Sequence, residues 1–188
     1  MKKHTAYSDV IDDCVQEFVE KNKKYGQSWT EDRIFTLAQQ VLIKLNRIKT
    51  IQQNRGLQKV DDPLEKEFPG IFNYCMLAKV RIKWTKERFV FERNVAHEKV
   101  VEEFKAAVDH TKELYAAKNH DYGEIWRVLL ISTMTDFMLN KYRRLEEIYL
   151  NPKPEQEKLD DYDEIFKDIA NYAVFCMANI RDGMNALQ

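Results

Sequence analysis

The sequence predicts an all-α protein, a helical bundle built from two tandem three-helix repeats packed as a pseudo-dimer. The 188 residues include only five glycines and four prolines. Long stretches therefore lack the turn residues that strands need every ~8–12 residues, which nearly excludes an all-β fold. The hydrophobic share of 44% is too high for a disordered chain, and the charged share of 32% is too high for a membrane protein. A soluble helical domain with a sizeable core is expected.

An internal repeat is the second observation behind this prediction. The string K-N-x-x-Y-G-x-x-W begins at Lys21 and again at Lys118, 97 positions later (118 − 21). Each half then carries K-x-x-R followed by N-Y, in the same order. The further matched positions are Lys44 and Lys141, Arg47 and Arg144, and, after a one-residue insertion, Asn73 and Asn171. We divide the chain into a first repeat, 1–95, and a second repeat, 96–188, packed as one globular unit with pseudo-twofold symmetry.

Turn and cap residues bound the expected helices of the first repeat. The expected spans are 8–24, about 28–54 and 69–83. Gly26 suits the left-handed conformation that ends the first helix. Ser28 and Glu31 have the spacing of a capping box for the second helix, along which apolar residues recur at helical intervals. Pro69 is expected to open the third helix, because proline is tolerated only in the first turn; Asp62 could begin a short helix before it.

The second repeat is expected to follow the same plan. The expected spans are 97–119, 124–150 and 161–182. Ser132 and Thr133 offer a fresh cap that could break the middle helix, and Gly183 is expected to stop the last one. A short helix near 86–94 could link the two repeats.

Charge and targeting signals limit the classes of function. Lysine plus arginine (30) nearly cancels aspartate plus glutamate (31), for a formal net charge of −1. This balance supplies no sequence-wide attraction to nucleic acid or anionic lipid, so direct nucleic-acid or membrane binding is not expected. No apolar run approaches the ~18 residues of a spanning helix, and the first residues lead into charge rather than an apolar signal core. We expect a cytoplasmic protein, which could also form a homodimer.

Acidic residues distinguish the two repeats. At four positions, the second repeat has an acidic residue where the first repeat has a non-acidic one. The matched pairs are Asp121 and Lys24, Glu124 and Gln27, Asp136 and Gln39, and Asp168 and Gly70. Since the fold should retain what both repeats need, whereas chemistry can be dropped from one, we take the second repeat as the active half. The first repeat is then a structural or partner half.

A magnesium site is one interpretation of these acids. Asp161, Glu164 and Asp168 follow one another at i+3 and i+4, so they share a helix face. Asp136 on the preceding helix could add an oxygen ligand. Oxygen-only donors favour Mg²⁺ over zinc, and we select Asp136, Glu164 and Asp168 as the ligands. The alternative is an ordinary solvated acidic face.

Basic and aromatic residues complete the candidate site. Lys141 and Arg144, one turn apart, are natural phosphate partners, although their recurrence in the first repeat fits a structural role nearly as well. Tyr122 and Trp126 could stack on a base. For aromatic residues repeated in both halves, packing of the helix–turn–helix corner is the better interpretation.

The string K-N-x-D-Y-G-x-x-W-R, from Lys118 to Arg127, followed by Asp136, K-x-x-R and D-I-x-N-Y, resembles a known family, nucleotide modification associated domain 1. The resemblance covers nearly the whole chain, because the family itself carries two copies. Such proteins occur in bacteria and phages, and the resemblance implies a role in the metabolism of free or modified deoxynucleotides. The family motif falls on Lys118, Asn119, Asp121, Tyr122, Gly123, Glu124, Trp126, Arg127, Asp136, Lys141, Arg144, Asp168, Asn171 and Tyr172.

The helical layout is also similar to the MazG-like all-α nucleoside triphosphate pyrophosphatases, which implies Mg²⁺-dependent release of pyrophosphate. Those enzymes carry E-x-x-E and E-x-x-D helices, whereas here the matching helices offer Asp136 and then Glu164-x-x-x-Asp168. Lys24 replaces the aspartate of the string in the first repeat, so at most one full site per chain is expected.

The leading hypothesis is a (deoxy)nucleoside triphosphate pyrophosphohydrolase with Mg²⁺ on its three carboxylates and Asp121 or Glu124 orienting the attacking water. The residues expected to bind substrate are Lys118, Asn119, Tyr122, Trp126, Arg127, Lys141, Arg144, Asn171 and Tyr172. The alternatives are a protein that binds a nucleotide or nucleotide-derived signal without cleaving it, and a helical interaction module without a small-molecule site.

Overall fold

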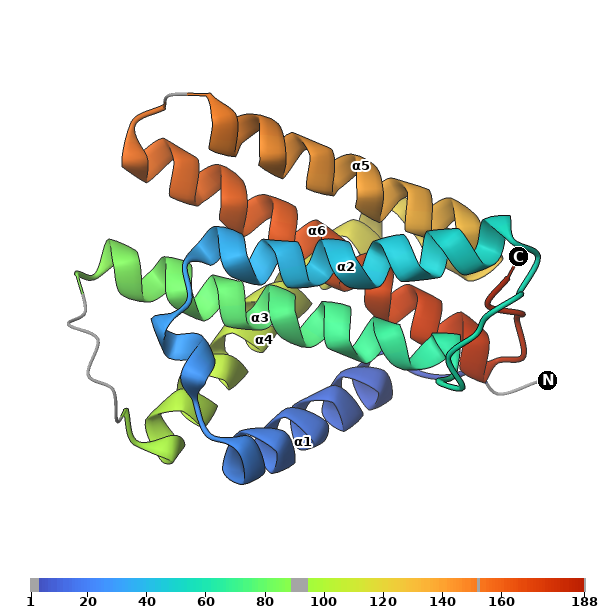
Figure 1. The fold of residues 1–188 in the computed structure, drawn as a ribbon, viewed down its shortest axis with the longest axis horizontal. Helices are drawn as coiled ribbons and strands as arrows, with labels where there is room; N and C mark the ends of the chain where they lie inside the picture. Colours follow the sequence, from blue (N-terminus) through green and yellow to red (C-terminus); the bar gives the residue numbers. More distant parts are fainter. Residues whose placement is uncertain (1–3, 89–94, 152, 188) are drawn as a thin grey trace.

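The computed structural model describes residues 4–88, 95–151 and 153–187, and in these residues it contains six α-helices and no strand (Figure 1). The helices are α1 (Tyr7–Tyr25), α2 (Ile34–Gln53), α3 (Glu67–Lys86), α4 (His97–Tyr122), α5 (Ile131–Leu150) and α6 (Glu155–Arg181). Short 3₁₀ helices precede α2, α3 and α5: η1 (Ser28–Glu31), η2 (Leu64–Lys66) and η3 (Ile125–Val128). The all-α fold and its two three-helix units are as the sequence predicts.

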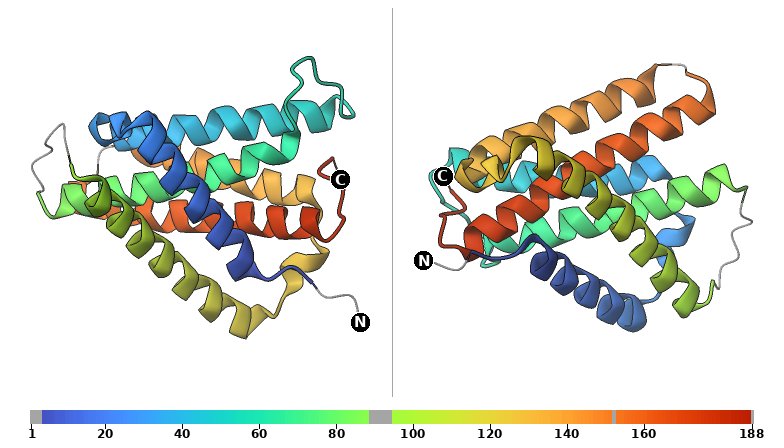
Figure 2. Two further views of the ribbon diagram at one scale, coloured as in Figure 1. Left: turned by 90° about the horizontal axis from the view of Figure 1, so that it is seen from below. Right: turned by 180° about the vertical axis from the view of Figure 1, so that it is seen from behind.

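Four long helices form the body of the molecule. α3 packs on α6 at the centre, α2 packs on α3 and α5, and α5 packs on α6. The remaining pair, α1 and α4, covers one side of these four helices (Figure 2). None of the helices in the described residues is long and apolar enough to cross a membrane.

Reciprocal aromatic contacts relate the two repeats. Tyr7 of α1 stacks on Tyr115 of α4 with ring centroids 3.6 Å apart, and Phe104 of α4 stacks on Phe18 of α1 at 3.7 Å. Positions 7 and 104 are equivalent in the two repeats, as are 18 and 115. The start of each repeat's first helix therefore packs on the end of the other's, as in a twofold dimer interface.

Helix α3 is buried on most of its surface because it lies between α2, α6 and the α1–α4 pair. Phe68 and Phe72 near its start and Trp84 near its end are fully buried. Lys79 is buried too, and its ammonium group pairs with Asp163 of α6. A helix that is apolar on nearly all sides is typical of a core position.

The turns before α2 and α5 differ from the prediction. Ser28 and Glu31 belong to a 3₁₀ helix rather than a capping box, and α2 begins only at Ile34 without a side-chain cap. In the second repeat the helix predicted from residue 124 begins at Ile131. The physical reason is burial: the single 3₁₀ turn directs a tryptophan, Trp29 or Trp126, into the core.

The third helix of each repeat begins earlier than predicted. α3 starts two residues before Pro69, which the first helical turn tolerates because its N–H groups have no intrahelical partner. α6 starts at Glu155, directly after Pro154. The predicted link near 86–94 lies mostly outside the described residues, and α3 itself extends to Lys86. Gly26 and Gly183 have positive φ, as expected for helix ends.

Candidate functional site

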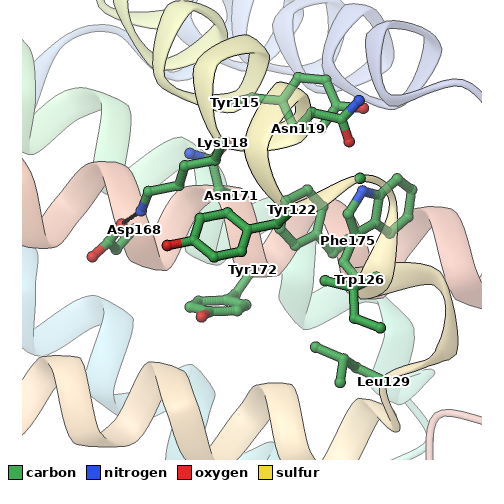
Figure 3. Close-up of a pocket in the computed structure, with 12 residues that line it drawn as sticks. Tyr115, Lys118, Asn119, Tyr122, Trp126, Leu129, Asp168, Asn171, Tyr172 and Phe175 are labelled. Atoms are coloured by element: carbon green, nitrogen blue, oxygen red, sulfur yellow. Dashed lines mark hydrogen bonds and ion pairs between the residues drawn. The ribbon is translucent and has the colours of Figure 1, made fainter.

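A cavity of about 320 Å³ opens where the turn between α4 and α5 meets α6 (Figure 3). We call it the second-repeat pocket. It is lined by Tyr115, Lys118, Asn119, Tyr122, Gly123, Ile125, Trp126, Leu129, Asp168, Asn171, Tyr172 and Phe175. Six of the residues expected to bind substrate are among them: Lys118, Asn119, Tyr122, Trp126, Asn171 and Tyr172.

The local sequence of the turn builds one wall of the pocket. Gly123 has a φ of 62°, a left-handed conformation that ends α4 and reverses the chain. Trp126 then packs against Phe175 with ring centroids 4.7 Å apart. The guanidinium of Arg127 lies 4.2 Å from the centre of the Trp126 ring and is itself held by Glu124 at 2.7 Å. Arg127 therefore fixes this wall and does not line the pocket.

Aromatic rings make the pocket suitable for a flat ligand. Tyr122, at the mouth, is 72% exposed. Tyr172 is half-buried, and its ring meets Phe175 edge-on and Phe137 at a tilt. Figure 3 shows the rings of Tyr122, Tyr172 and Phe175 gathered beside the Lys118–Asp168 pair. A planar ring can stack on such surfaces.

An ion triad occupies the other end of the pocket. Both carboxylate oxygens of Asp168 are engaged, one by Lys118 Nζ and one by Lys141 Nζ, each at 2.6 Å. Burial alone would raise the pKa of Asp168, but the hydrogen bonds from Lys118 and Lys141 outweigh it and hold that pKa below its usual value. Two lysines against one carboxylate leave an excess of positive charge that suits a phosphate.

Two amide side chains in the pocket have unused hydrogen-bonding capacity. Asn171 is 5% exposed, and its Oδ1 accepts a hydrogen bond from the hydroxyl of Tyr7. Within the part of the chain that the structure describes, Asn171 Nδ2 and Asn119 Oδ1 have no hydrogen-bond partner. A buried polar atom without a partner costs about 1–3 kcal/mol, so both atoms are available to a ligand.

Sequence reasoning missed four lining residues, Tyr115, Ile125, Leu129 and Phe175, and it also missed Tyr7, which contacts the site from behind its lining. Tyr7 comes from α1 of the first repeat and reaches the second-repeat pocket through its stack on Tyr115. Its equivalent in the second repeat, Phe104, lacks the hydroxyl, and Asn73 Oδ1 beside the other pocket has no partner among the described residues. The difference between tyrosine and phenylalanine at positions 7 and 104 is the signal that could have found it.

Several predicted site residues lie outside the pocket lining. Asp121 is mostly exposed and pairs with His120, and Glu124 pairs with Arg127. Arg144 is exposed on α5. Lys141 pairs with Asp168 but is not one of the lining residues. Neither carboxylate expected to orient water therefore lines the cavity as it stands.

The three carboxylates expected to share a magnesium ion are not brought together. Asp136 pairs with Lys49 of α2, Glu164 pairs with Lys167, and Asp168 pairs with its two lysines. In the described ranges, no three histidine, cysteine, aspartate or glutamate side chains are grouped to hold a metal ion. The trio does not fit a shared Mg²⁺ site, because each carboxylate is paired with lysine instead of being grouped with the other two.

The structure is that of a two-repeat helical protein with a cavity at the turn between α4 and α5. A family model for nucleotide modification associated domain 1 matches the chain twice, over residues 21–82 and 118–180. The chain belongs to this family, and each matched segment lies within one of its two repeats. No curated protein and no solved structure gives a match.

Proposed function

We propose that the second-repeat pocket binds a free nucleotide. The observation that carries the proposal is the combination, in one cavity, of an exposed ring, Tyr122, with the Lys118–Asp168 pair. Lys141 reaches the same carboxylate from beside the cavity. Packing accounts for the buried Trp126 but not for a tyrosine that is 72% exposed. The volume of about 320 Å³ lies at the lower end of the ~300–1,000 Å³ typical of small-molecule sites.

The two ends of the pocket take the two parts of the ligand. The base stacks on Tyr122 and Tyr172, where Asn119 Oδ1 and Asn171 Nδ2 offer an acceptor and a donor. The phosphates lie at Lys118 and Lys141. The formal net charge of −1 supports a free nucleotide of the cytoplasm rather than a nucleic acid as the ligand.

Asp168 links phosphate binding to a cation. When phosphate draws Lys118 and Lys141 away, Asp168 becomes available as an oxygen ligand. Mg²⁺ commonly takes one or two carboxylates together with substrate phosphates and waters. A single carboxylate in the pocket fits a magnesium ion that arrives with the nucleotide, where the ion would neutralise phosphate charge.

Cleavage of the bound nucleotide is a second candidate function, and Asp168 is the observation that favours it. Asp168 is the carboxylate that lines the pocket, beside the lysines expected to hold phosphate. A nucleoside triphosphate pyrophosphohydrolase of MazG-like type would use such a group with Mg²⁺ to position phosphate for attack by water.

Thermal melting tests the binding proposal. Each of the four 2′-deoxynucleoside triphosphates is added with Mg²⁺ or with EDTA. A ligand that binds only the folded state raises the melting temperature by mass action. We expect a Mg²⁺-dependent rise in the wild type that is lost in Lys118→Ala and Tyr122→Ala. Lys105→Ala, an exposed change on the same helix, is the matched control and should behave as the wild type.

Two results would count against the proposal. One is that no triphosphate raises the melting temperature with Mg²⁺. The other is that Lys118→Ala and Tyr122→Ala melt as the wild type does under every condition. Measurement of pyrophosphate released from the same mixtures then separates cleavage from binding. Release that disappears in Asp168→Asn identifies a hydrolase, whereas a nucleotide recovered unchanged identifies a binding protein.

A further inference from the structure

A second cavity, of about 310 Å³, lies at the turn between α1 and α2. We call it the first-repeat pocket. Its lining repeats that of the second-repeat pocket at seven matched positions with identical residues: Lys21, Asn22, Tyr25, Gly26, Trp29, Asn73 and Tyr74. The two pockets are therefore built in the same way, although acids are missing from the first.

Tyr25 resembles Tyr122 in its exposure, which packing of the fold does not require. Its equivalent, Tyr122, is 72% exposed, and Tyr25 is 70% exposed. The buried tryptophans of the two turns explain the packing of both corners. Both repeats have a tyrosine at this position, and in neither repeat is it buried by packing. Each ring therefore offers a stacking surface at the mouth of its pocket.

The charged lining differs between the two pockets. Lys118 and Asp168 line the second-repeat pocket, whereas Lys21 and Lys44 line the first, which has no carboxylate among its lining residues. Gly70 stands where Asp168 stands in the other repeat.

Gly70 has a steric role in this arrangement. A Cβ atom at this position would lie 2.5 Å from Lys44 Cε. The glycine therefore allows Lys44 to lie across α3 at the pocket. Lys44 is held from outside the pocket by Glu67, at 3.0 Å, and Glu67 also pairs with Arg47. One carboxylate against two cations leaves positive charge at this end.

Of the other polar side chains that line the first-repeat pocket, Asn22 is already hydrogen-bonded and Lys21 is available to a ligand. Asn22 is already engaged by His97 at 2.9 Å and by Trp29 at 3.3 Å. Lys21 pairs with Glu17 on the exposed side of α1, and such surface pairs contribute little, about 0–1 kcal/mol. Lys21 is thus able to turn toward a ligand, beside Lys44.

We propose that the first-repeat pocket is a second ligand site, which binds a nucleoside monophosphate without a divalent cation. The base stacks on Tyr25 and the phosphate lies between Lys21 and Lys44, where no lining carboxylate opposes it. The inference rests on the recognition chemistry of the proposed function but assigns a different site and a different metal dependence. Each chain would then carry two unlike sites.

Equilibrium dialysis in EDTA tests this site with each of the four 2′-deoxynucleoside 5′-monophosphates. We expect one bound nucleotide per wild-type chain with at least one of the four. Tyr25→Ala should weaken it about tenfold or more, which corresponds to about 1.4 kcal/mol. Tyr122→Ala, the matched exposed change in the other repeat, should leave it unchanged. Circular dichroism of both variants checks that they fold.

A second variant tests the charge argument. Gly70→Asp adds a carboxylate and displaces Lys44, so it should abolish binding in EDTA, whereas Gly70→Ala should weaken it less. The inference is overturned if no monophosphate binds in EDTA, or if binding survives Tyr25→Ala and is lost in Tyr122→Ala. The proposed function fails by a different result, namely that Tyr122→Ala leaves the Mg²⁺-dependent effect of triphosphates intact.

Discussion

Asp168 depends on its two lysine partners while the pocket is empty. Its side chain is 17% exposed, and Lys118 and Lys141 each lie 2.6 Å away. An acidic cluster along α6 would make Asp168→Asn nearly neutral for stability, because removing one like charge relieves repulsion. The triad reverses this expectation, since loss of the carboxylate leaves two lysines facing each other.

We therefore predict that Asp168→Asn lowers the free energy of unfolding by about 1–3 kcal/mol, the range for a polar group left without its partner, because both lysines remain partly exposed to water. It should also abolish Mg²⁺-dependent nucleotide binding. Urea denaturation measures the first effect. Asp161→Asn, on the same helix with Lys153 as its partner near the surface, is the control; an equal loss in that variant would contradict the role of the triad.

The same triad predicts a pH dependence. The folded-state pKa of Asp168 is held below its usual value, so its stabilising contribution is present above the unfolded pKa of ~3.9 and is lost as pH falls through the folded pKa. The difference in unfolding free energy between wild type and Asp168→Asn should stay constant from about pH 5 to 7 and shrink below about pH 4. A difference that grew on acidification would be inconsistent with a lowered pKa.

Tyr7 contacts the second repeat through its hydroxyl group as well as through its ring. We predict that Tyr7→Phe, which leaves Asn171 Oδ1 without its donor, destabilises the protein by about 1–2 kcal/mol. It should also weaken Mg²⁺-dependent nucleotide binding, because Asn171 would no longer be held in place. Tyr149→Phe, at an exposed tyrosine of α5, supplies the control for loss of a hydroxyl. Similar stabilities of the two variants would show that the Tyr7 hydroxyl has no special role.

The contact between α3 and α6 contains one buried ion pair. Lys79 and Asp163 meet there, and Lys167 lies 3.6 Å from the same carboxylate. The equivalent of Lys79 in the second repeat is Met177. Removing one member of a buried pair costs about 3–5 kcal/mol when the other charge is left alone.

We expect Lys79→Met to cost somewhat less, about 2–3 kcal/mol, because Lys167 remains near Asp163. The double variant Lys79→Met with Asp163→Asn should recover part of the loss, since it removes the unpaired charge. Denaturation in urea gives both values. A double variant less stable than Lys79→Met alone would mean that Asp163 does not depend on Lys79.

At the scale of the whole molecule, the two repeats contribute to one hydrophobic core. Phe68 and Phe72 of α3 and Phe166 of α6 are fully buried in the assembled protein, where α3 and α6 pack together. A separated repeat would expose this surface to water.

We predict that residues 96–188 expressed alone are poorly helical or self-associate, and that adding residues 1–95 restores a helical one-to-one complex. Circular dichroism and sedimentation velocity measure the two properties. A monomeric, cooperatively folding second repeat would show that the repeats are independent domains.

Much of the candidate site was predictable from the linear motif. Lys118, Asn119, Tyr122 and Trp126 lie within nine residues of sequence, so one helix end and one turn bring them together whatever the rest of the fold does. Several predicted residues lie outside the lining because other side chains hold them. Arg127 and Glu124 pair with each other at i+3, and Asp136 faces a lysine that another helix supplies.

The sequence by itself determined the all-α class, the two repeats and the family. These properties follow from the composition and from the order of the motif residues, and neither depends on contacts between helices. Only the tertiary structure decided the partners of the carboxylates, the hydroxyl that Tyr7 supplies and the presence of a pocket in each repeat. Ion pairs and stacked rings form between helices distant in sequence, and their geometry depends on how α1 and α4 cross the other four.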